Sequence, residues 1–158
     1  MEEQDLKFLR RCVELAREAV DHGDEAFGSL LVNADGEILV EDRNRIAGGD
    51  STQHPEFNIA RWAAANMTPE ERAGATVYTS GEHCPMCSAA HAWVGLGPIV
   101  FAAGSDQFAG WLRAWGLPDS PVNTLRVNEV APGIATRGPA LELAAEIQAL
   151  HARAFGVA

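Results

Sequence analysis

Hydrophobic residues recur along the first twenty positions at steps of three and four, which predicts an amphipathic helix that stops near Gly23. The following segment, GSLLVNADGEILVEDRN, has two short apolar runs on either side of Asp35-Gly36. Because Asp-Gly tolerates the positive φ angles of a tight turn, this segment predicts a β-hairpin. The helical stripe consists of Leu6, Leu9, Val13, Ala16 and Val20.

The rest of the chain alternates between helical and extended patterns. HPEFNIARWAAANM is rich in helix formers and carries Pro55 in its first turn, where a backbone N–H has no partner anyway. ATVYTS predicts a buried strand, CPMCSAAHAWVG a helix and PIVFAA a further strand. A strand, a helix and a strand at this spacing predict a parallel pair joined by a right-handed crossover. ALELAAEIQALHARAF predicts a closing helix.

These elements predict an α/β protein, a three-layer α-β-α sandwich around a mixed sheet of about five strands. The length of 158 residues suits one domain, 1–158, in which we expect the variable, aromatic-rich segment 105–158 and its C-terminal helix to cover a pocket. No apolar run reaches membrane-spanning length, and the charged N-terminal segment lacks a secretory signal. We therefore expect a cytoplasmic location and no membrane partner.

Charge and cysteine content narrow the function. The formal net charge is −10 with dispersed Lys and Arg, which disfavours nucleic acid as the main partner, because affinity for it comes largely from neutralised phosphates. Of the three cysteines, Cys12 lies among helical apolar positions and is expected in the core. Cys84 and Cys87 lie three residues apart without an export signal, which favours metal binding or redox chemistry over a disulfide framework.

Two predicted helices begin with metal-binding side chains, one with His54 and the other with Cys84 and Cys87. Both follow loops that we place at the same edge of the sheet. One imidazole and two thiolates supply three tetrahedral ligands and leave a fourth position for water, as catalytic zinc sites do. A helix N-terminus also favours the ionised thiol. We therefore predict one Zn²⁺ per chain.

Glu56 lies two residues after a predicted ligand, so its carboxylate can lie beside the attacking water without binding the metal. There it could pass a proton from that water to the ring nitrogen and the departing amine. A redox role for Cys84 and Cys87 would require a thioredoxin-like N-terminal pattern, which the sequence lacks. His91 could close the site as a fourth ligand, although a packing histidine is the simpler interpretation.

The chain resembles the cytidine-deaminase-like superfamily. HPEFNIARWAA matches its His-x-Glu helix, VYTSGEHCPMC its strand and Cys loop, and AFGSLLVNADGEILVEDRN its hairpin. Within the superfamily, the chain looks most like the bacterial branch of guanine deaminases and tRNA adenosine deaminases, up to about Trp115. The resemblance implies the cytidine-deaminase-like fold, a catalytic zinc ion, Glu56 as proton shuttle and a homodimer or larger assembly.

Several residues are candidates for contact with the substrate. The resemblance places Asn44 at the end of the hairpin, facing the substrate. His83 stands where the family usually has Pro and would add a titratable side chain close to the pocket, and Pro55 stands where the family commonly has Ala. Phe27 suits either a pocket wall or the core. The full set is Asn44, Phe27, His83, Pro55, Asp106, Trp111 and Trp115.

The last three candidates have equally simple alternatives. Trp111 and Trp115 could stack on a flat heterocycle, or they could belong to the core or to a dimer interface. Asp106 could be a second acid, as in purine-deaminating relatives, or a helix N-cap. Glu142 or Glu146 could reach a neighbouring subunit's pocket, or they could lie on a solvated helix face.

The predicted function is hydrolytic, zinc-dependent deamination of a small amino-substituted heterocycle, first a purine base such as guanine, with water as co-substrate and release of ammonia. The alternatives are a nucleoside deaminase acting on cytidine, guanosine or adenosine, and a zinc-stabilised binding protein without catalysis. Glu56 argues against the binding protein, because a structural zinc site has no use for an acid at this position. Action on tRNA is disfavoured by the acidic charge.

Overall fold

A five-stranded mixed sheet forms the centre of the computed structural model, which describes residues 1–157. The strand order is β2-β1-β3-β4-β5, with antiparallel pairing of β1 to β2 and β3, and parallel pairing of β4 to β3 and β5. The strands are β1 (Gly28–Val32), β2 (Ile38–Arg43), β3 (Thr76–Gly81), β4 (Ile99–Ala103) and β5 (Thr136–Arg137).

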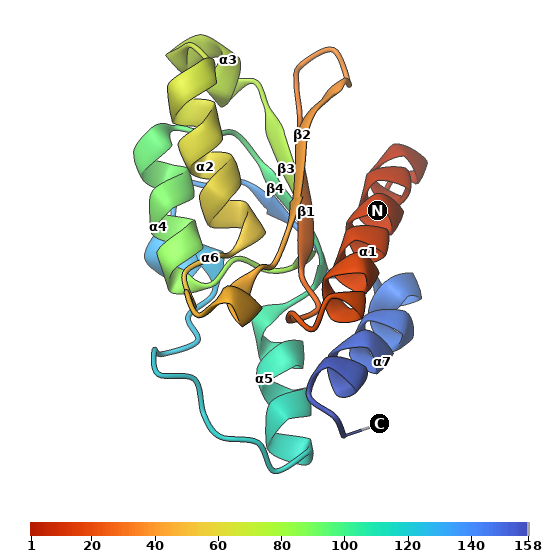
Figure 1. The fold of residues 1–158 in the computed structure, drawn as a ribbon. Helices are drawn as coiled ribbons and strands as arrows, with labels where there is room; N and C mark the ends of the chain where they lie inside the picture. The colour runs from red at the N-terminus through yellow and green to blue at the C-terminus, as the bar shows by residue number, and fades with distance from the viewer. Residues whose placement is uncertain (158) are drawn as a thin grey trace.

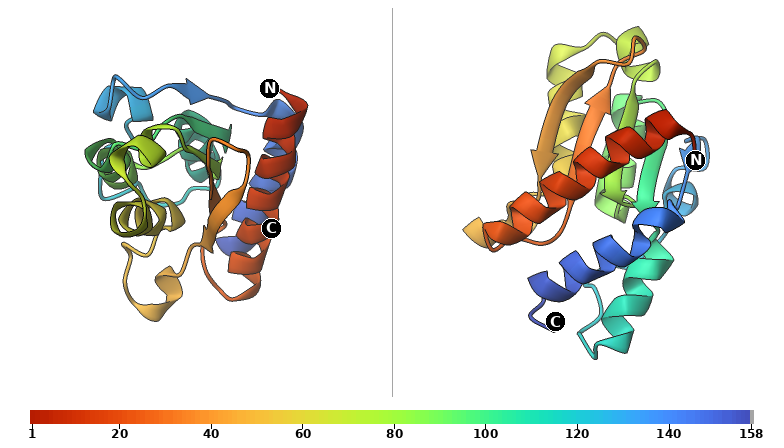
Figure 2. Two further views of the ribbon diagram at one scale, coloured as in Figure 1. Left: turned by 90° about the horizontal axis from the view of Figure 1, so that it is seen from above. Right: turned by 90° about the vertical axis from the view of Figure 1, so that its right-hand side faces the viewer.

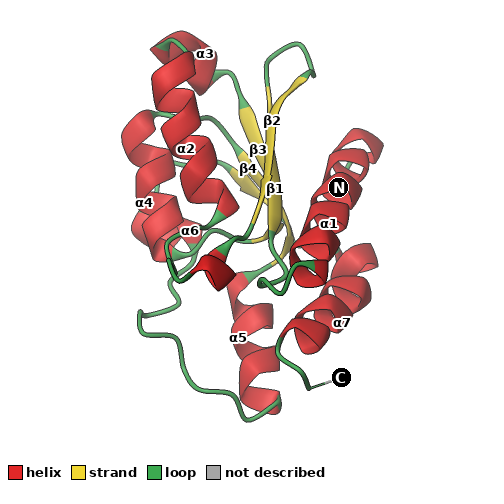
Figure 3. Ribbon diagram, viewed as in Figure 1, coloured by secondary structure: helices red, strands yellow, loops and turns green. Residues whose placement is uncertain are grey.

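Helices cover both faces of the sheet, so the predicted three-layer α-β-α fold is confirmed (Figures 1 and 3). One layer holds α1 (Glu3–Asp21) and α7 (Ala144–Ala154), which lie on the same face in the right-hand view of Figure 2. The opposite layer holds α2 (Pro55–Asn66), α3 (Pro69–Ala73) and α4 (Pro85–Val94). The remaining helices are α5 (Ser105–Ala114), α6 (Val127–Val130) and the short η1 (Ile46–Gly48) and η2 (Leu141–Leu143).

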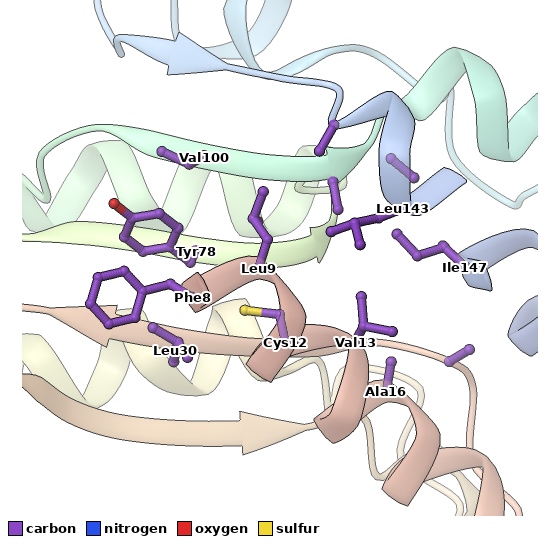
Figure 4. Packing of buried hydrophobic residues seen from close by; sticks show 14 of the residues in the cluster. Phe8, Leu9, Cys12, Val13, Ala16, Leu30, Tyr78, Val100, Leu143 and Ile147 are labelled. Atoms are coloured by element: carbon purple, nitrogen blue, oxygen red, sulfur yellow. The ribbon is translucent and has the colours of Figure 1, made fainter. Parts of the chain in front are cut away.

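The apolar stripe of α1 forms the larger core by packing onto β1, β3 and β4 (Figure 4). Leu9 and Cys12 are completely buried in this core, and Cys12 is a free thiol, which confirms its predicted packing role. From the C-terminal side of the chain, Leu143 and Ile147 complete the same core. Burial of one such leucine contributes on the order of 2 kcal/mol. The core therefore fixes α7 beside α1.

A second core lies on the other face and positions the starts of α2 and α4. Ile59, Ala60 and Ala63 of α2 pack with Val77 of β3 and with Leu96 after α4. The two helices contact each other, and each has proline at its first position, where the missing N–H costs no helical bond. Because α2 and α4 pack side by side on the same face of the sheet, their N-termini meet beside the end of β3. Among residues 1–157, no helix is both long and apolar enough to cross a membrane.

Candidate active site

Three metal-binding side chains meet where α2 and α4 begin. Nδ1 of His54 lies 3.5 Å from Sγ of Cys84 and 3.6 Å from Sγ of Cys87. The three donor atoms all lie within 4.8 Å of one another. His54 precedes α2 and Cys84 precedes α4, while Cys87 is buried in the first turn of α4. The structure thus brings together the three residues that the sequence predicted as ligands.

One of the two thiols of this cluster ionises readily. A hydrogen bond with Cys87, followed by one with His54, lowers the pKa of Cys84 to about 4, while the same bond with Cys84 raises the pKa of the Cys87 thiol. The thiolate is the form of cysteine that binds metals, and a helix N-terminus stabilises it further. One imidazole and two thiols at this spacing are a donor set that suits Zn²⁺. The residues present therefore fit a zinc ion.

Glu56 lies beside the cluster in the first turn of α2 and is almost completely buried. Its Oε1 accepts hydrogen bonds from the hydroxyls of Ser29, at 2.9 Å, and Thr79, at 3.3 Å. Burial raises the pKa of Glu56 above the ordinary value for a glutamate. Two adjacent strands thus hold this carboxyl in one orientation, with a proton affinity suited to acid–base chemistry.

A cavity of about 920 Å³ opens onto His54, Glu56 and Cys84. Its lining also includes residues of α5, residues 117–125 and His151 of α7. Four rings form an aromatic wall, those of Phe27, Phe108, His151 and Phe155: Phe27 lies 5.4 Å from Phe108 and 4.9 Å from His151, measured between ring centroids. The cavity therefore joins a metal-binding, acid-bearing side to a flat, largely apolar side.

Of the predicted substrate contacts, Phe27 lines the cavity, whereas Trp111 and Trp115 do not. Trp111 packs against the larger core, with its ring centroid 6.0 Å from that of His151. Trp115 follows the last residue of α5. Trp111 is therefore half-buried against the core, and neither tryptophan lines the cavity.

Asn44 and Pro55, two further predicted substrate contacts, are buried and do not line the cavity. Asn44 is completely buried, and its Oδ1 accepts hydrogen bonds from the backbone N–H groups of Glu25, at 3.3 Å, and Ile46, at 3.1 Å. Glu25 and Ile46 both line the cavity, so Asn44 shapes that wall. Nδ2 of Asn44 is buried without a partner in the described part of the chain. Pro55 is buried at the start of α2.

His83 does not lie in the pocket, so the expectation that it adds a polar side chain there is wrong. His83 is completely buried and is absent from the cavity lining. Its ring lies edge-on to that of His91, with 5.3 Å between centroids. Successive side chains of extended backbone point to opposite sides, so Cys84 faces the cluster and His83 faces inward. Nε2 of His91 lies 2.7 Å from the carbonyl of Gly97, so His91 is a packing residue and not a fourth ligand.

The predicted acidic candidates lie on the surface. Asp106 is exposed in the first turn of α5, 2.7 Å from Arg126, and the residue that caps this helix is Gly104. Glu146 of α7 pairs with Arg17 of α1, and Glu142 is exposed in η2. None of these three acids lines the cavity.

Several residues of the cavity wall were not among the predicted contacts. Glu25 lines the cavity, and burial raises the pKa of its carboxyl. Phe108, Phe155 and His151 form the aromatic side. His151 follows the buried Ile147 by one helical turn, so the helical period of α7 could have identified it as buried. Nothing local in the sequence indicates that it meets Phe27.

Comparisons with known proteins agree with this geometry. Residues 2–103 match the family model of the cytidine and deoxycytidylate deaminase zinc-binding region. A guanine deaminase of Bacillus subtilis is 36% identical over 98 residues, which are 61% of this chain and 62% of the relative. A probable cytosine deaminase of Schizosaccharomyces pombe is 31% identical over 107 residues, 68% of this chain and 65% of the relative. The chain thus spans less than two thirds of both curated relatives.

A solved structure shares the fold over nearly the whole chain. It is a variant of the protein NE0047 in complex with 8-azaguanine, and it matches with a TM-score of 0.74 and 25% identity. The match covers 95% of this chain and 84% of that one. The similarity therefore extends to α5 and α7, beyond the residues that the family model covers.

Proposed function

Because this chain belongs to the cytidine and deoxycytidylate deaminase family, we propose that it is a zinc-dependent hydrolytic deaminase whose substrate is a purine base such as guanine. One observation carries the proposal. The buried Glu56, held by Ser29 and Thr79, lies beside three donor atoms that suit zinc and faces a cavity. Neither a structural zinc site nor a redox pair needs such a carboxyl.

The residues of the chain divide the work of the reaction. A zinc ion held by His54, Cys84 and Cys87 would supply a Lewis acid that activates water as the nucleophile. Glu56 takes one proton from the attacking water and delivers it to the ring nitrogen, and it then takes the second proton from the new hydroxyl and delivers it to the departing amine. The oxygen of water becomes bonded to the amine-bearing carbon, the C–N bond breaks, and ammonia leaves. The hydroxyls of Ser29 and Thr79 keep the carboxyl aligned throughout.

The aromatic wall and the relatives support a purine. Phe27 and Phe108 offer flat apolar surfaces next to the metal site, which suit a planar heterocycle. The B. subtilis relative is a guanine deaminase, and NE0047 binds 8-azaguanine. A net charge of −10 disfavours a polynucleotide as the substrate. We also retain the prediction of a cytoplasmic homodimer.

A nucleoside deaminase is the second candidate, and the size of the cavity favours it. A volume of about 920 Å³ lies near the upper end of small-molecule pockets and leaves room for a sugar beside the base. The rim that would meet such a sugar is the loop 115–126, of which residues 117–125 line the cavity.

An ammonia-release panel over bases, nucleosides and s-triazines, combined with a zinc measurement, tests the proposal. We expect one zinc ion per chain and turnover of guanine. Glu56→Gln should keep the zinc and the melting temperature but lower ammonia release roughly 1,000-fold, because the proton shuttle is lost. Glu70→Gln, the same exchange at an exposed acid of α3, is the matched control and should leave activity unchanged.

Each other outcome of the panel has a definite meaning. Turnover of nucleosides without turnover of free bases would replace the purine base by the second candidate and leave the mechanism intact. Normal activity of Glu56→Gln would show that another group carries the protons. A wild-type protein that holds zinc but releases no ammonia from any compound would favour a binding protein.

A further inference from the structure

The aromatic wall of the cavity contains one polar side chain, His151 of α7. It is 1% exposed and lines the cavity. Its ring centroid lies 4.6 Å from that of Phe108, 4.9 Å from that of Phe27 and 6.0 Å from that of Trp111. Two separate parts of the chain, α5 and the residue before β1, thus surround this imidazole. The family model ends at residue 103, so it does not cover His151.

The imidazole of His151 lacks a protein partner where one is needed. Its Nδ1 is buried without a hydrogen-bond partner among residues 1–157. A neutral imidazole carries one donor and one acceptor, and an unpaired buried polar group costs about 1–3 kcal/mol. A phenylalanine or leucine would pack against the same rings without that cost. His151 lines the cavity, so its ring borders the space that a bound ligand would fill.

We propose that His151 is a specificity-determining residue that hydrogen-bonds a polar edge of the heterocycle held against Phe27 and Phe108. This inference rests on the proposed function and adds to it the group that distinguishes one ring from another. Heterocycles of similar shape, whether purines or pyrimidines, differ in the order of hydrogen-bond donors and acceptors along their edges. An imidazole held in one position by the surrounding rings would pair with an edge that offers a matching donor or acceptor and would leave a mismatched edge unpaired.

The charge state of His151 supports this role. Burial lowers its pKa to about 3, so the ring is neutral at every pH at which the protein would work. A neutral ring can accept a hydrogen bond from a ring N–H or donate one to a ring nitrogen or carbonyl. His151 is consequently distinct from Glu56, whose task is to move protons.

The test replaces the imidazole by a ring of similar shape. His151→Phe should raise KM for guanine about tenfold, with a smaller change in kcat, because a site built around a hydrogen bond loses affinity when the bond is removed. Its melting temperature should equal or exceed that of the wild type. Calorimetric Kd values for guanine and its deaza and methyl analogues, measured in the Glu56→Gln background, give a readout independent of turnover.

The analogues identify the contacted edge. In the wild-type cavity, one analogue that lacks a donor or acceptor should bind about tenfold more weakly than guanine, and His151→Phe should abolish that difference. His151→Gln, which keeps a polar group, should restore part of it. His22→Phe, the same exchange at an exposed histidine, should change none of these values.

The outcomes separate this inference from the proposed function. If guanine is deaminated but His151→Phe leaves KM, Kd and the ranking of analogues unchanged, the specificity role is wrong and the deaminase stands. If His151→Phe does not fold, an unchanged ranking in His151→Gln overturns the role equally. If the wild type neither binds nor deaminates any base or nucleoside, the proposed function fails and this inference fails with it.

Discussion

On one side of the cavity, short-range features of the chain fix the reactive groups, whereas on the other side long-range packing builds the wall. His54, Glu56 and Cys84 lie at the starts of two helices, within the part of the chain that the family model matches. Phe108 and His151 come from α5 and α7, beyond the end of that match. Under the proposed function, the reaction and the choice of substrate would therefore belong to separable parts of the molecule.

The two sides meet at Phe27, which directly precedes β1. Its ring packs over Gly81, at the end of β3, and also contacts Phe108 and His151. Gly81 leads into the loop that carries Cys84. Phe27 is therefore the contact through which a change on one side can reach the other.

The largest expected effect comes from removing one metal ligand while the aromatic wall stays intact. Cys87→Ser removes one of three donors, so we expect loss of zinc and a fall in ammonia release of roughly 1,000-fold, about 4 kcal/mol in the barrier. Glu56→Gln should keep the metal and Cys87→Ser should lose it, and a zinc assay of both variants measures this difference.

Cys12→Ala is the matched control for this prediction. Cys12 is as deeply buried as Cys87 but lies on α1 in the larger core and is not part of the donor cluster. It should lower the free energy of unfolding by about 1–2 kcal/mol while zinc content stays at one per chain. Retention of zinc by Cys87→Ser would contradict the ligand set.

The next largest effect tests the contact between the two sides. A Cβ atom at position 81 would lie 2.8 Å from Cε1 and 3.0 Å from Cδ1 of Phe27, so Gly81→Ala must displace that ring. We expect a loss of about 1–3 kcal/mol in the free energy of unfolding and a KM increase of about tenfold, with zinc content unchanged. Urea unfolding and steady-state kinetics measure these quantities.

Gly110 of α5 offers the control, because a Cβ atom there meets nothing within 4 Å. Gly110→Ala should stabilise the helix by about 0.5–1 kcal/mol without an effect on KM. If Gly81→Ala also left stability and KM unchanged, Phe27 would move at no cost and the two sides would not be coupled through it.

The same division explains which features the sequence could reveal. The donors His54, Cys84 and Cys87 were predictable, because each lies at a helix start that a proline and a helical pattern mark locally. The layers of the fold followed from alternating strand and helix patterns. Strand β5 was not located, because a strand of two residues carries no measurable period.

The wall was not predictable for a physical reason. His151 faces Phe27 only because α7 packs against α1 and the sheet, and no local spacing encodes a contact across more than a hundred residues. The orientation of His83 likewise follows from the extended backbone at Cys84 and not from residue type. Residue type alone does not separate these two histidines; packing decides which one reaches the cavity.

The smallest expected effect concerns the acids of the C-terminal segment, Glu142 and Glu146. Glu146 pairs with Arg17 at a site where both side chains are more than two-fifths exposed, and such pairs contribute less than about 1 kcal/mol. The double variant Glu142→Gln/Glu146→Gln should therefore keep kcat within about twofold and the free energy of unfolding within about 1 kcal/mol. His151→Phe, on the same helix, should instead change KM.

A large fall in kcat for this double variant would mean that an acid of the C-terminal segment reaches a cavity, its own or a neighbouring subunit's. Mixing the double variant with Glu56→Gln would distinguish the two cases, because activity returns in a mixed oligomer only if the acids act across subunits. In either case, α7 would take part in the chemistry as well as in the choice of substrate, and the separation of the two sides would fail. An unchanged kcat, together with a KM effect at His151, would leave α7 the task of recognising the ring alone.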